Sequence, residues 1–184
     1  NNAIINILKQ RQQNTYMNSE DKVNKLSKSD FISIFGNVFE KTEWIAEKTY
    51  GLKPFSDFQE IYSGMIDTFE NSKKDDILKI LNSHPELAIE KIMTQDSKKE
   101  QSNAQLNNCT KEELAEFVKL NNDYKKKFNF PFIFAVKGKN KKEILNNFRD
   151  RITNEINVEF EEAKKQVKKI ASFRLNQIKI DNQL

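Results

Sequence analysis

Apolar residues recur at intervals of three and four along most of the chain, the spacing of one face of an α-helix. The first face starts at Ser27 and continues to Phe39, and a second segment runs from Glu43 to Tyr50. Thr42 before this segment and Gly51 after it are residue types that favour helix ends. The apolar positions of the first three faces are Phe31, Ile34, Phe35, Val38 and Phe39, then Ile45 and Ala46, then Phe58, Ile61, Tyr62, Met65, Ile66 and Phe69.

The second half of the chain continues this pattern. Ile77, Leu78 and Leu81 indicate a helix that ends before His84. Thr110 and Glu113 have the spacing of a capping box, which predicts a helix start at that point. The last third is helical with an expected break near Thr153-Asn154, and its apolar positions are Ile144, Phe148, Ile152, Ile156, Phe160, Ala163, Val167 and Ile170.

One segment departs from the helical period. Residues 130–136, Phe-Pro-Phe-Ile-Phe-Ala-Val, form a continuous apolar run that contains a proline. Such a run cannot make an amphipathic helix, and it is too short and isolated to start a sheet. We expect a buried extended segment beneath the helices. The fold class is therefore all-α, a single-domain multi-helix bundle with a buried extended Phe-Pro-Phe segment.

The chain divides into two parts by composition. Residues 1–24 are mostly polar and are expected to form a linker or a loosely attached segment outside the core, whereas residues 25–184 form the helical domain. Only 4 Gly and 3 Pro occur in 184 residues, too few turn formers for a β-sandwich or barrel. A core is possible because 37% of the residues are hydrophobic, among them 14 Phe.

Composition also limits the function. No apolar stretch approaches the ~20 residues of a membrane-spanning helix. Cys109 is the single cysteine, so the chain has no internal disulfide and no cysteine-based metal site, which favours a reducing cytoplasm. The net charge of +4 comes from 31 basic and 27 acidic residues that alternate along the chain, which favours a solvated mixed surface over nucleic-acid binding.

His84 is the only histidine, and imidazole is the side chain whose ordinary pKa lies near neutral pH. The following Pro85 supports a structural interpretation, because proline is favoured at the first helical position and His84 would then cap a helix start. In the functional interpretation, the same rigid corner directs the imidazole out of the helix start as an acid–base group. The residues alone leave both interpretations open.

Other candidate groups are polar residues on predicted helices. Glu100 and Gln101 lie in the Lys-rich stretch 97–101, where glutamate and glutamine are usually surface residues. Arg174 is flanked by apolar residues, so its guanidinium is expected to need a buried anion. That anion is either a glutamate of the chain or a carboxylate of a substrate. No metal-ligand cluster of His and Cys and no glycine-rich phosphate loop is present.

Five segments in this order resemble the OHCU decarboxylases, enzymes of ureide metabolism. They are Phe35-Gly36-Asn37-Val38-Phe39-Glu40, His84-Pro85-Glu86-Leu87-Ala88, residues 97–101 with Ala104, residues 127–132 with Val136-Lys137-Gly138, and Arg174-Leu175. The resemblance covers about residues 27–180. It implies an all-helical enzyme without metal or organic cofactor that converts 2-oxo-4-hydroxy-4-carboxy-5-ureidoimidazoline (OHCU) to (S)-allantoin and CO2.

The resemblance also implies roles for individual residues. His84 is expected to be the acid–base residue, Glu100 its carboxylate partner and Arg174 a clamp for the substrate anion. The expected substrate-binding residues are Pro85, Ser97, Gln101, Phe132, Ile133, Phe134, Ala135 and Val136. The family further implies a homodimer, and the start at Asn1 suggests fusion to an upstream ureide-pathway enzyme in a bacterial cytoplasm.

Two bulky residues stand where the family usually has glycine: Ile89 follows the His-Pro motif, and Gln105 follows Ala104. They support an alternative from a different class, a catalytically weakened helical interaction module that retains the fold. Absence of turnover by the chain would favour that alternative.

Overall fold

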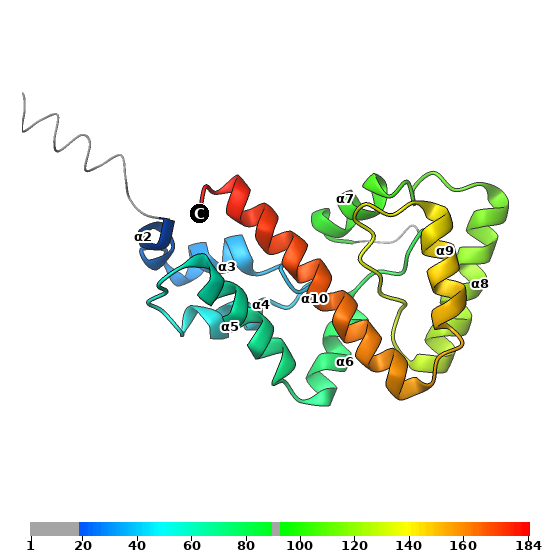
Figure 1. Cartoon of the computed structure of the whole chain (residues 1–184), viewed down its shortest axis with the longest axis horizontal. Coiled ribbons are helices and arrows are strands. Elements are labelled where there is room, and N and C mark those ends of the chain that lie inside the picture. Colours follow the sequence, from blue (N-terminus) through cyan, green and yellow to red (C-terminus); the bar gives the residue numbers. More distant parts are fainter. Residues whose placement is uncertain (1–18, 90–92) are drawn as a thin grey trace, which may run out of the picture.

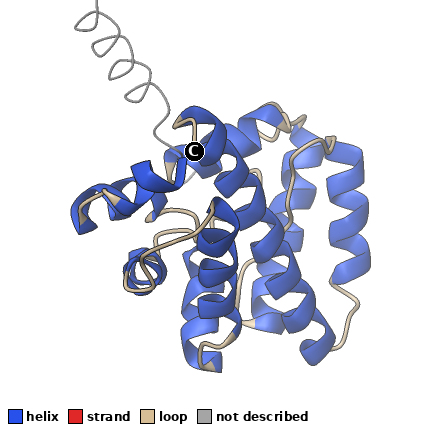
Figure 2. Ribbon diagram, turned by 60° about the vertical axis from the view of Figure 1, so that its left-hand side comes forward, coloured by secondary structure: helices blue, strands red, loops and turns tan. Residues whose placement is uncertain are grey.

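The computed structural model describes residues 19–89 and 93–184. These residues form helices joined by turns and loops, and no β-strand occurs among them (Figure 2). The helices are α2 (Ser19–Asn24), α3 (Lys28–Phe35), α4 (Glu43–Tyr50), α5 (Phe58–Glu70), α6 (Lys74–Ser83), α7 (Gln95–Asn103), α8 (Lys111–Phe128), α9 (Lys141–Arg151) and α10 (Ile156–Asp181). The predicted all-α, single-domain fold is confirmed.

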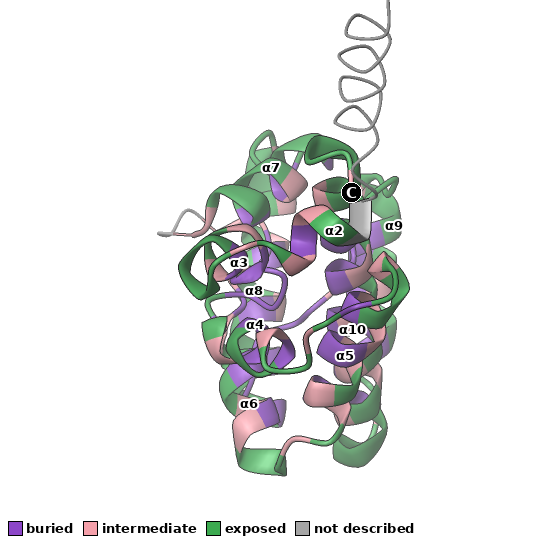
Figure 3. Ribbon diagram, turned by 90° about the vertical axis from the view of Figure 1, so that its left-hand side faces the viewer, coloured by how far each residue is buried: buried purple, intermediate pink, exposed green. Residues whose placement is uncertain are grey.

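The long helix α10 connects two groups of helices. It packs against α3 and α5 on one side and against α6 and α8 on the other. In Figure 1, α10 (orange to red) runs between the group α2–α5 and the group α7–α9. Buried residues face the interior of the molecule and exposed residues lie on its outside (Figure 3).

Each group has its own cluster of aromatic side chains. Phe31 lies at the centre of the first cluster and contacts the rings of Phe35 and Phe55. In the second cluster, the rings of Phe132 and Phe148 stack 3.8 Å apart, and Tyr124 meets Phe132 edge-on. Burial of large rings of this kind is the main favourable contribution to such cores.

Helix starts follow the local signals in the sequence. At α8 the Thr110 hydroxyl accepts from the Glu113 amide, and the Glu113 carboxylate accepts from the Thr110 amide, so the predicted capping box is confirmed. Asn140 and Glu143 make an equivalent box at α9. The break expected near Thr153-Asn154 separates α9 from α10.

The helix around Phe31 is shorter than its apolar face predicts. It ends at Phe35, and Val38 and Phe39 are buried in the turns that follow. Gly36 permits this change of direction because a Cβ there would lie 2.5 Å from the Ile32 carbonyl oxygen. The apolar period therefore predicted the burial of Val38 and Phe39 correctly, but it placed the end of the helix too late.

The capping roles of Thr42 and Gly51 also differ from expectation, although the bounds of α4 are as predicted. The Thr42 hydroxyl donates to the Glu40 carbonyl and makes no capping bond. Gly51 has a right-handed φ of −65° rather than the left-handed conformation common after helices.

Residues 23 and 24 make contacts with the helical domain. Val23 is 2% exposed within the core, and the Asn24 side chain bonds both the amide and the carbonyl of Phe55. Residues 1–18 of the predicted linker lie outside the described part of the chain.

Residues 131–136 connect α8 to α9 and adopt neither helix nor strand. All of them except the half-buried Phe134 are buried. None of the described helices is long and apolar enough to cross a membrane.

Candidate active site

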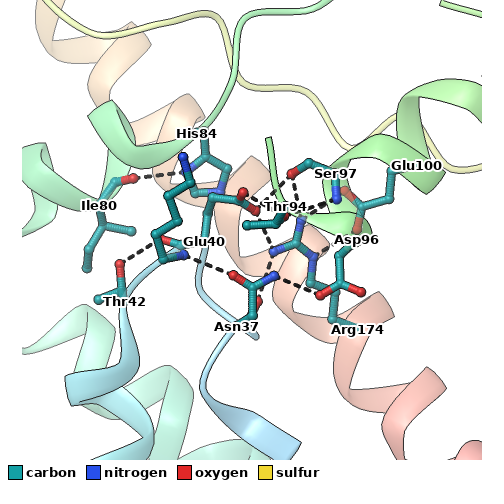
Figure 4. Close-up of polar contacts among 11 residues, drawn as sticks. Asn37, Glu40, Thr42, Ile80, His84, Thr94, Asp96, Ser97, Glu100 and Arg174 are labelled. Atoms are coloured by element: carbon teal, nitrogen blue, oxygen red, sulfur yellow. Dashed lines mark hydrogen bonds and ion pairs between the residues drawn. The ribbon is translucent and has the colours of Figure 1, made fainter. Parts of the chain in front are cut away.

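Four segments of the chain meet at one buried polar cluster (Figure 4). Glu40 comes from the turn after α3, and His84 comes from the C-terminal end of α6. Ser97 and Glu100 lie on α7, and Arg174 lies on α10. The cluster thus forms where the two groups of helices come together.

His84 ends a helix instead of starting one. It is the C-cap of α6 with an extended backbone, and residues 85–89 form a turn with no helix. The predicted helix start at Pro85 is therefore wrong. Proline disfavours the helical conformation of the residue before it, which ends α6, and the positive φ of Ala88 (59°) is incompatible with a new helix.

The His84 ring is 8% exposed, and its Nδ1 lies 2.9 Å from the Ile80 carbonyl oxygen. Because a carbonyl oxygen only accepts, Nδ1 carries the hydrogen and Nε2 of the neutral ring keeps a lone pair. Burial, with a smaller contribution from the Arg174 charge, lowers the pKa of His84 to about 4, against the opposing effects of the Ile80 carbonyl and Glu40. The ring is therefore neutral at pH 7.

Arg174 uses all five of its N–H groups within the protein. Its Nε and Nη2 donate to the two oxygens of Glu100 at 2.8 and 3.0 Å. Its Nη1 donates to Glu40 at 2.8 Å and to the Asn37 carbonyl, and its Nη2 donates to the Ser97 hydroxyl. Of the two alternatives left by the sequence, the structure contains the buried ion pair with glutamates.

Glu40 was not singled out from the sequence, although it is the most buried charge in the cluster, with no exposed surface. It accepts from Arg174 and from the hydroxyls of Thr94 and Ser97 at 2.7–2.8 Å. Burial would raise its pKa, but Arg174 and the hydrogen bonds outweigh burial and lower it. The sequence feature that could have identified Glu40 is an acidic residue directly after the apolar pair Val38-Phe39.

Glu100 and His84 line the same cavity, but no hydrogen bond joins them among the described residues. The carboxylate of Glu100 pairs with Arg174, and its side chain is 29% exposed. Glu40, rather than Glu100, is the carboxylate whose charge acts on the His84 pKa.

Gln101 binds the turn that follows His84. Its Oε1 accepts from the Ala88 amide at 3.0 Å, and its Nε2 donates to the Glu86 carbonyl at 3.2 Å. The side-chain amide thus holds the 86–88 turn against α7.

The cavity beside His84 has a volume of about 30 Å³, far below the roughly 300–1,000 Å³ of ligand-binding pockets. The expected residues that line it are Pro85, Ser97, Gln101, Phe132, Ile133, Phe134 and Val136, together with His84, Glu100 and Arg174. Ala135 does not line it and lines an adjoining cavity of about 400 Å³. The two cavities share Glu100, Val136, Ile170 and Arg174 as walls.

No group of three or more His, Cys, Asp or Glu side chains suited to hold a metal ion occurs in residues 19–89 and 93–184. The ionisable groups that line the cavity are the His84 imidazole, the Glu100 carboxylate and the Arg174 guanidinium, and the Glu40 carboxylate bonds to Arg174. Such a set can bind an anion and move a proton.

Comparison with known proteins identifies the family of the chain. The family model of OHCU decarboxylase matches residues 24–176. A uric acid degradation bifunctional protein of Bacillus sp. (strain TB-90) is 40% identical over 157 residues, which are 85% of this chain and 31% of that protein. The chain thus spans about a third of that relative's length.

Two further relatives are matched over more of their length or in three dimensions. A 2-oxo-4-hydroxy-4-carboxy-5-ureidoimidazoline decarboxylase of Haloferax volcanii is 33% identical, with 84% of this chain and 92% of that protein aligned. A crystal structure of (S)-allantoin synthase superposes with a TM-score of 0.71 at 26% identity, over 86% of this chain and 53% of that chain.

Proposed function

Because the chain belongs to the OHCU decarboxylase family, we propose that it decarboxylates OHCU to (S)-allantoin and CO2 in urate degradation. The observation that carries the proposal is the cavity at which His84, Glu100 and Arg174 meet from three separate helices. Buried imidazole and guanidinium at one cavity provide a proton carrier and an anion site, which are the groups that this reaction requires.

We assign the substrate carboxylate to Arg174. All five N–H groups of Arg174 are occupied, so an incoming carboxylate must replace one partner. Glu100 is the partner to be replaced, because its side chain is 29% exposed whereas that of Glu40 is fully buried. A substrate carboxylate at Nε and Nη2 would restore the same bidentate geometry. The released Glu100 would then lie beside the bound substrate.

His84 moves the proton in this proposal. Decarboxylation leaves an electron pair that passes to the adjacent imine of the substrate. The neutral Nε2 accepts the proton of the neighbouring hydroxyl and returns it to one face of the imine carbon, and the imine nitrogen takes a proton from water. Such acid–base assistance is typically worth ~10²–10⁴-fold in rate.

The substrate must enlarge the cavity in order to bind, because about 30 Å³ is far below the roughly 300–1,000 Å³ of ligand-binding pockets. The adjoining cavity of about 400 Å³ supplies the space, since Glu100 and Arg174 form part of the wall between the two. Exchange of Glu100 for the substrate carboxylate would join them. Bound substrate would then be held by Arg174 beside His84.

The test is formation of optically active (S)-allantoin, followed by circular dichroism with substrate freshly made from urate. The wild-type chain should exceed spontaneous decay, and His84→Ala should lose at least about 100-fold with its far-UV spectrum unchanged. Ser83→Ala, which removes only a hydroxyl bonded to the Lys79 carbonyl, is the matched control and should keep full activity. Wild-type turnover no faster than spontaneous decay would instead favour the helical interaction module.

We further propose a homodimer and fusion to an upstream ureide-pathway enzyme in a bacterial cytoplasm. The family resemblance supports the dimer, and the similar bifunctional protein of Bacillus supports the fusion. The single Cys109 supports a reducing compartment. Light scattering of the purified chain, and the intact mass and cell fraction of the natural product, would test these three points.

A further inference from the structure

Two buried side chains that do not line the cavity form hydrogen bonds to the backbone of residues 131–136, the segment beside it. Arg151 on α9 donates from Nη1 to the Ile133 carbonyl at 2.6 Å. Gln166 on α10 accepts from the Ala135 amide at 3.0 Å through Oε1. Arg151 and Gln166 are 5% and 3% exposed, and neither lines the cavity beside His84.

Arg151 is fixed in place by a buried polar network. Its Nε and Nη2 both donate to Oε1 of Glu159, at 2.8 and 2.5 Å. The same oxygen accepts from the Tyr124 hydroxyl, and Oε2 of Glu159 accepts from Asn154. Glu159 and Tyr124 have no exposed surface. Glu159 accepts at both of its oxygens, and a buried network of this kind holds its members in one geometry.

Arg151 also contacts Phe132, the residue next to Ile133. The centre of its guanidinium lies 4.5 Å from the centre of the Phe132 ring, which also stacks on the ring of Phe148. One side chain therefore restrains both the Phe132 ring and the Ile133 carbonyl. Both residues line the cavity.

Phe134 lies between the two residues whose backbone groups are bonded by Arg151 and Gln166. In the described part of the chain, neither the amide nor the carbonyl of Phe134 has a hydrogen-bond partner, and Phe134 lines the cavity.

We propose that Arg151 and Gln166 are positioning residues for substrate binding: they hold Ile133 and Ala135 from behind and so present the Phe134 amide and carbonyl to the cyclic amide of the substrate. The inference rests on the proposed function. In this proposal, residues of α8, α9 and α10 that do not contact the substrate determine how the backbone of residues 131–136 recognises the substrate ring.

A purely structural role for these residues predicts a different kinetic result. Loss of fold reduces the amount of active enzyme, which lowers the apparent kcat and leaves KM unchanged. Loss of aligned binding groups weakens ground state and transition state together, which raises KM and leaves kcat unchanged. The ratio of the two effects therefore separates the roles.

The test uses Arg151→Lys, which keeps the charge beside Glu159 but cannot reach both Glu159 and the Ile133 carbonyl, and Gln166→Met, which removes the bond to Ala135 together with the hydrogen bond that Nε2 donates to the Glu162 carboxylate. Each should raise KM about tenfold, the effect of one misplaced hydrogen bond, with kcat within threefold of wild type. Arg149→Lys is the control on the same helix, because Arg149 pairs with Glu116 at the surface, and it should leave KM unchanged. If Arg151→Lys does not fold, Gln166→Met decides alone.

Hydrogen exchange of residues 130–137 gives a readout that does not depend on turnover. Both variants should exchange faster there, while α8 should exchange as in wild type. A lower kcat at unchanged KM, or unchanged kinetics, would overturn the inference. If the wild-type chain shows no turnover, the proposed function fails. Unchanged hydrogen exchange at residues 130–137 in both variants would separately overturn the positioning role of Arg151 and Gln166.

Discussion

Burial acts in opposite directions on the two innermost titratable groups of the cavity. The His84 ring finds only a carbonyl oxygen at Nδ1, and burial lowers its pKa to about 4, so it loses its charge. Glu40 is buried as deeply but receives three donors, and these outweigh burial and hold its pKa below the ordinary value. A neutral base and a fixed carboxylate therefore stand side by side at pH 7.

The low pKa of His84 makes stability depend on pH. In the unfolded chain His84 takes up a proton as pH falls below 6.5, whereas in the folded protein it stays neutral until about pH 4. The unfolded state binds more protons across this window, so the free energy of unfolding falls as pH falls, by up to about 3 kcal/mol. Urea denaturation of wild type between pH 7 and pH 4 measures this loss.

The variant His84→Asn isolates the contribution of the ring. Asparagine places a donor near the position of Nδ1 but does not titrate, so the variant should lose less stability than wild type between pH 6.5 and pH 4. Carboxylates such as Glu40 contribute to both proteins. Parallel losses in the two proteins would show that His84 is not held neutral.

Backbone strain identifies a second residue whose replacement is informative. Gln105 has a φ of 58°, in the left-handed region, and its side chain is exposed. Non-glycine residues lose about 1–2 kcal/mol in this conformation, and glycine gives part of that back through its freedom in the unfolded chain. Gln105→Gly should therefore raise the free energy of unfolding by about 0.5–1 kcal/mol, measured by urea denaturation.

Asn129 provides the comparison for Gln105. It has a φ of 63° at the end of α8, and asparagine tolerates this region better than other non-glycine residues. Asn129→Gly should thus give a smaller gain than Gln105→Gly. A loss of stability in Gln105→Gly would mean that its side chain makes a contribution that the strain does not explain.

At the scale of single helices, capping boxes fix where α8 and α9 start. The α8 box has a further connection, because Glu113 also accepts from Lys141 at 2.8 Å, at the first turn of α9. The start of one helix is thus tied to the start of the next. This pairing keeps α8 and α9 in register behind residues 131–136.

Thr110→Ala tests the cap of α8. Loss of the hydroxyl leaves the Glu113 amide without its acceptor and should cost about 1 kcal/mol of unfolding free energy, with KM and kcat unchanged. Lys73→Ala is the matched control, because Lys73 is the N-cap of α6 and makes no side-chain capping bond. The Lys73 variant should stay within about 0.5 kcal/mol of wild type. Equal effects of the two substitutions would contradict a capping role for Thr110.

At the scale of the whole molecule, α10 packs against both helix groups and joins them into one folding unit. It contacts α3 and α5 in one group and α8 in the other, and it carries both Arg174 and Gln166. The pairing of Arg174 needs both groups, because its partner Glu40 belongs to the first group and its partner Glu100 to the second. Separation of the groups would therefore abolish the site.

This coupling predicts a single unfolding transition. Trp44, the only tryptophan, lies on α4 and reports on the first group, whereas far-UV circular dichroism reports on all helices. The two signals should give the same midpoint in urea. Two separated midpoints would show that the second group unfolds independently of the first.

Local signals in the sequence predicted most of the helices, because spacing and caps act within a few residues. The face of α5 and the break between α9 and α10 are where the apolar positions predicted, and on α10 Ala163, Val167 and Ile170 are buried whereas Ile156 is exposed. Two errors have local causes: α3 ends early at Gly36, and the positive φ of Ala88 prevents a helix start at Pro85. Phe39 continues the face of α3 only in sequence, since the chain turns at Gly36 to carry Glu40 toward Arg174.

The sequence by itself determined the all-α fold, the family and the side chains available at the cavity. Only the tertiary structure decided how they are paired: Arg174 is saturated by two glutamates, Glu40 is one of them, and Arg151 and Gln166 hold residues 131–136. The physical reason is that periodicity and capping are local, whereas the pKa of a buried group and the partner of a buried charge depend on residues brought together across the whole chain.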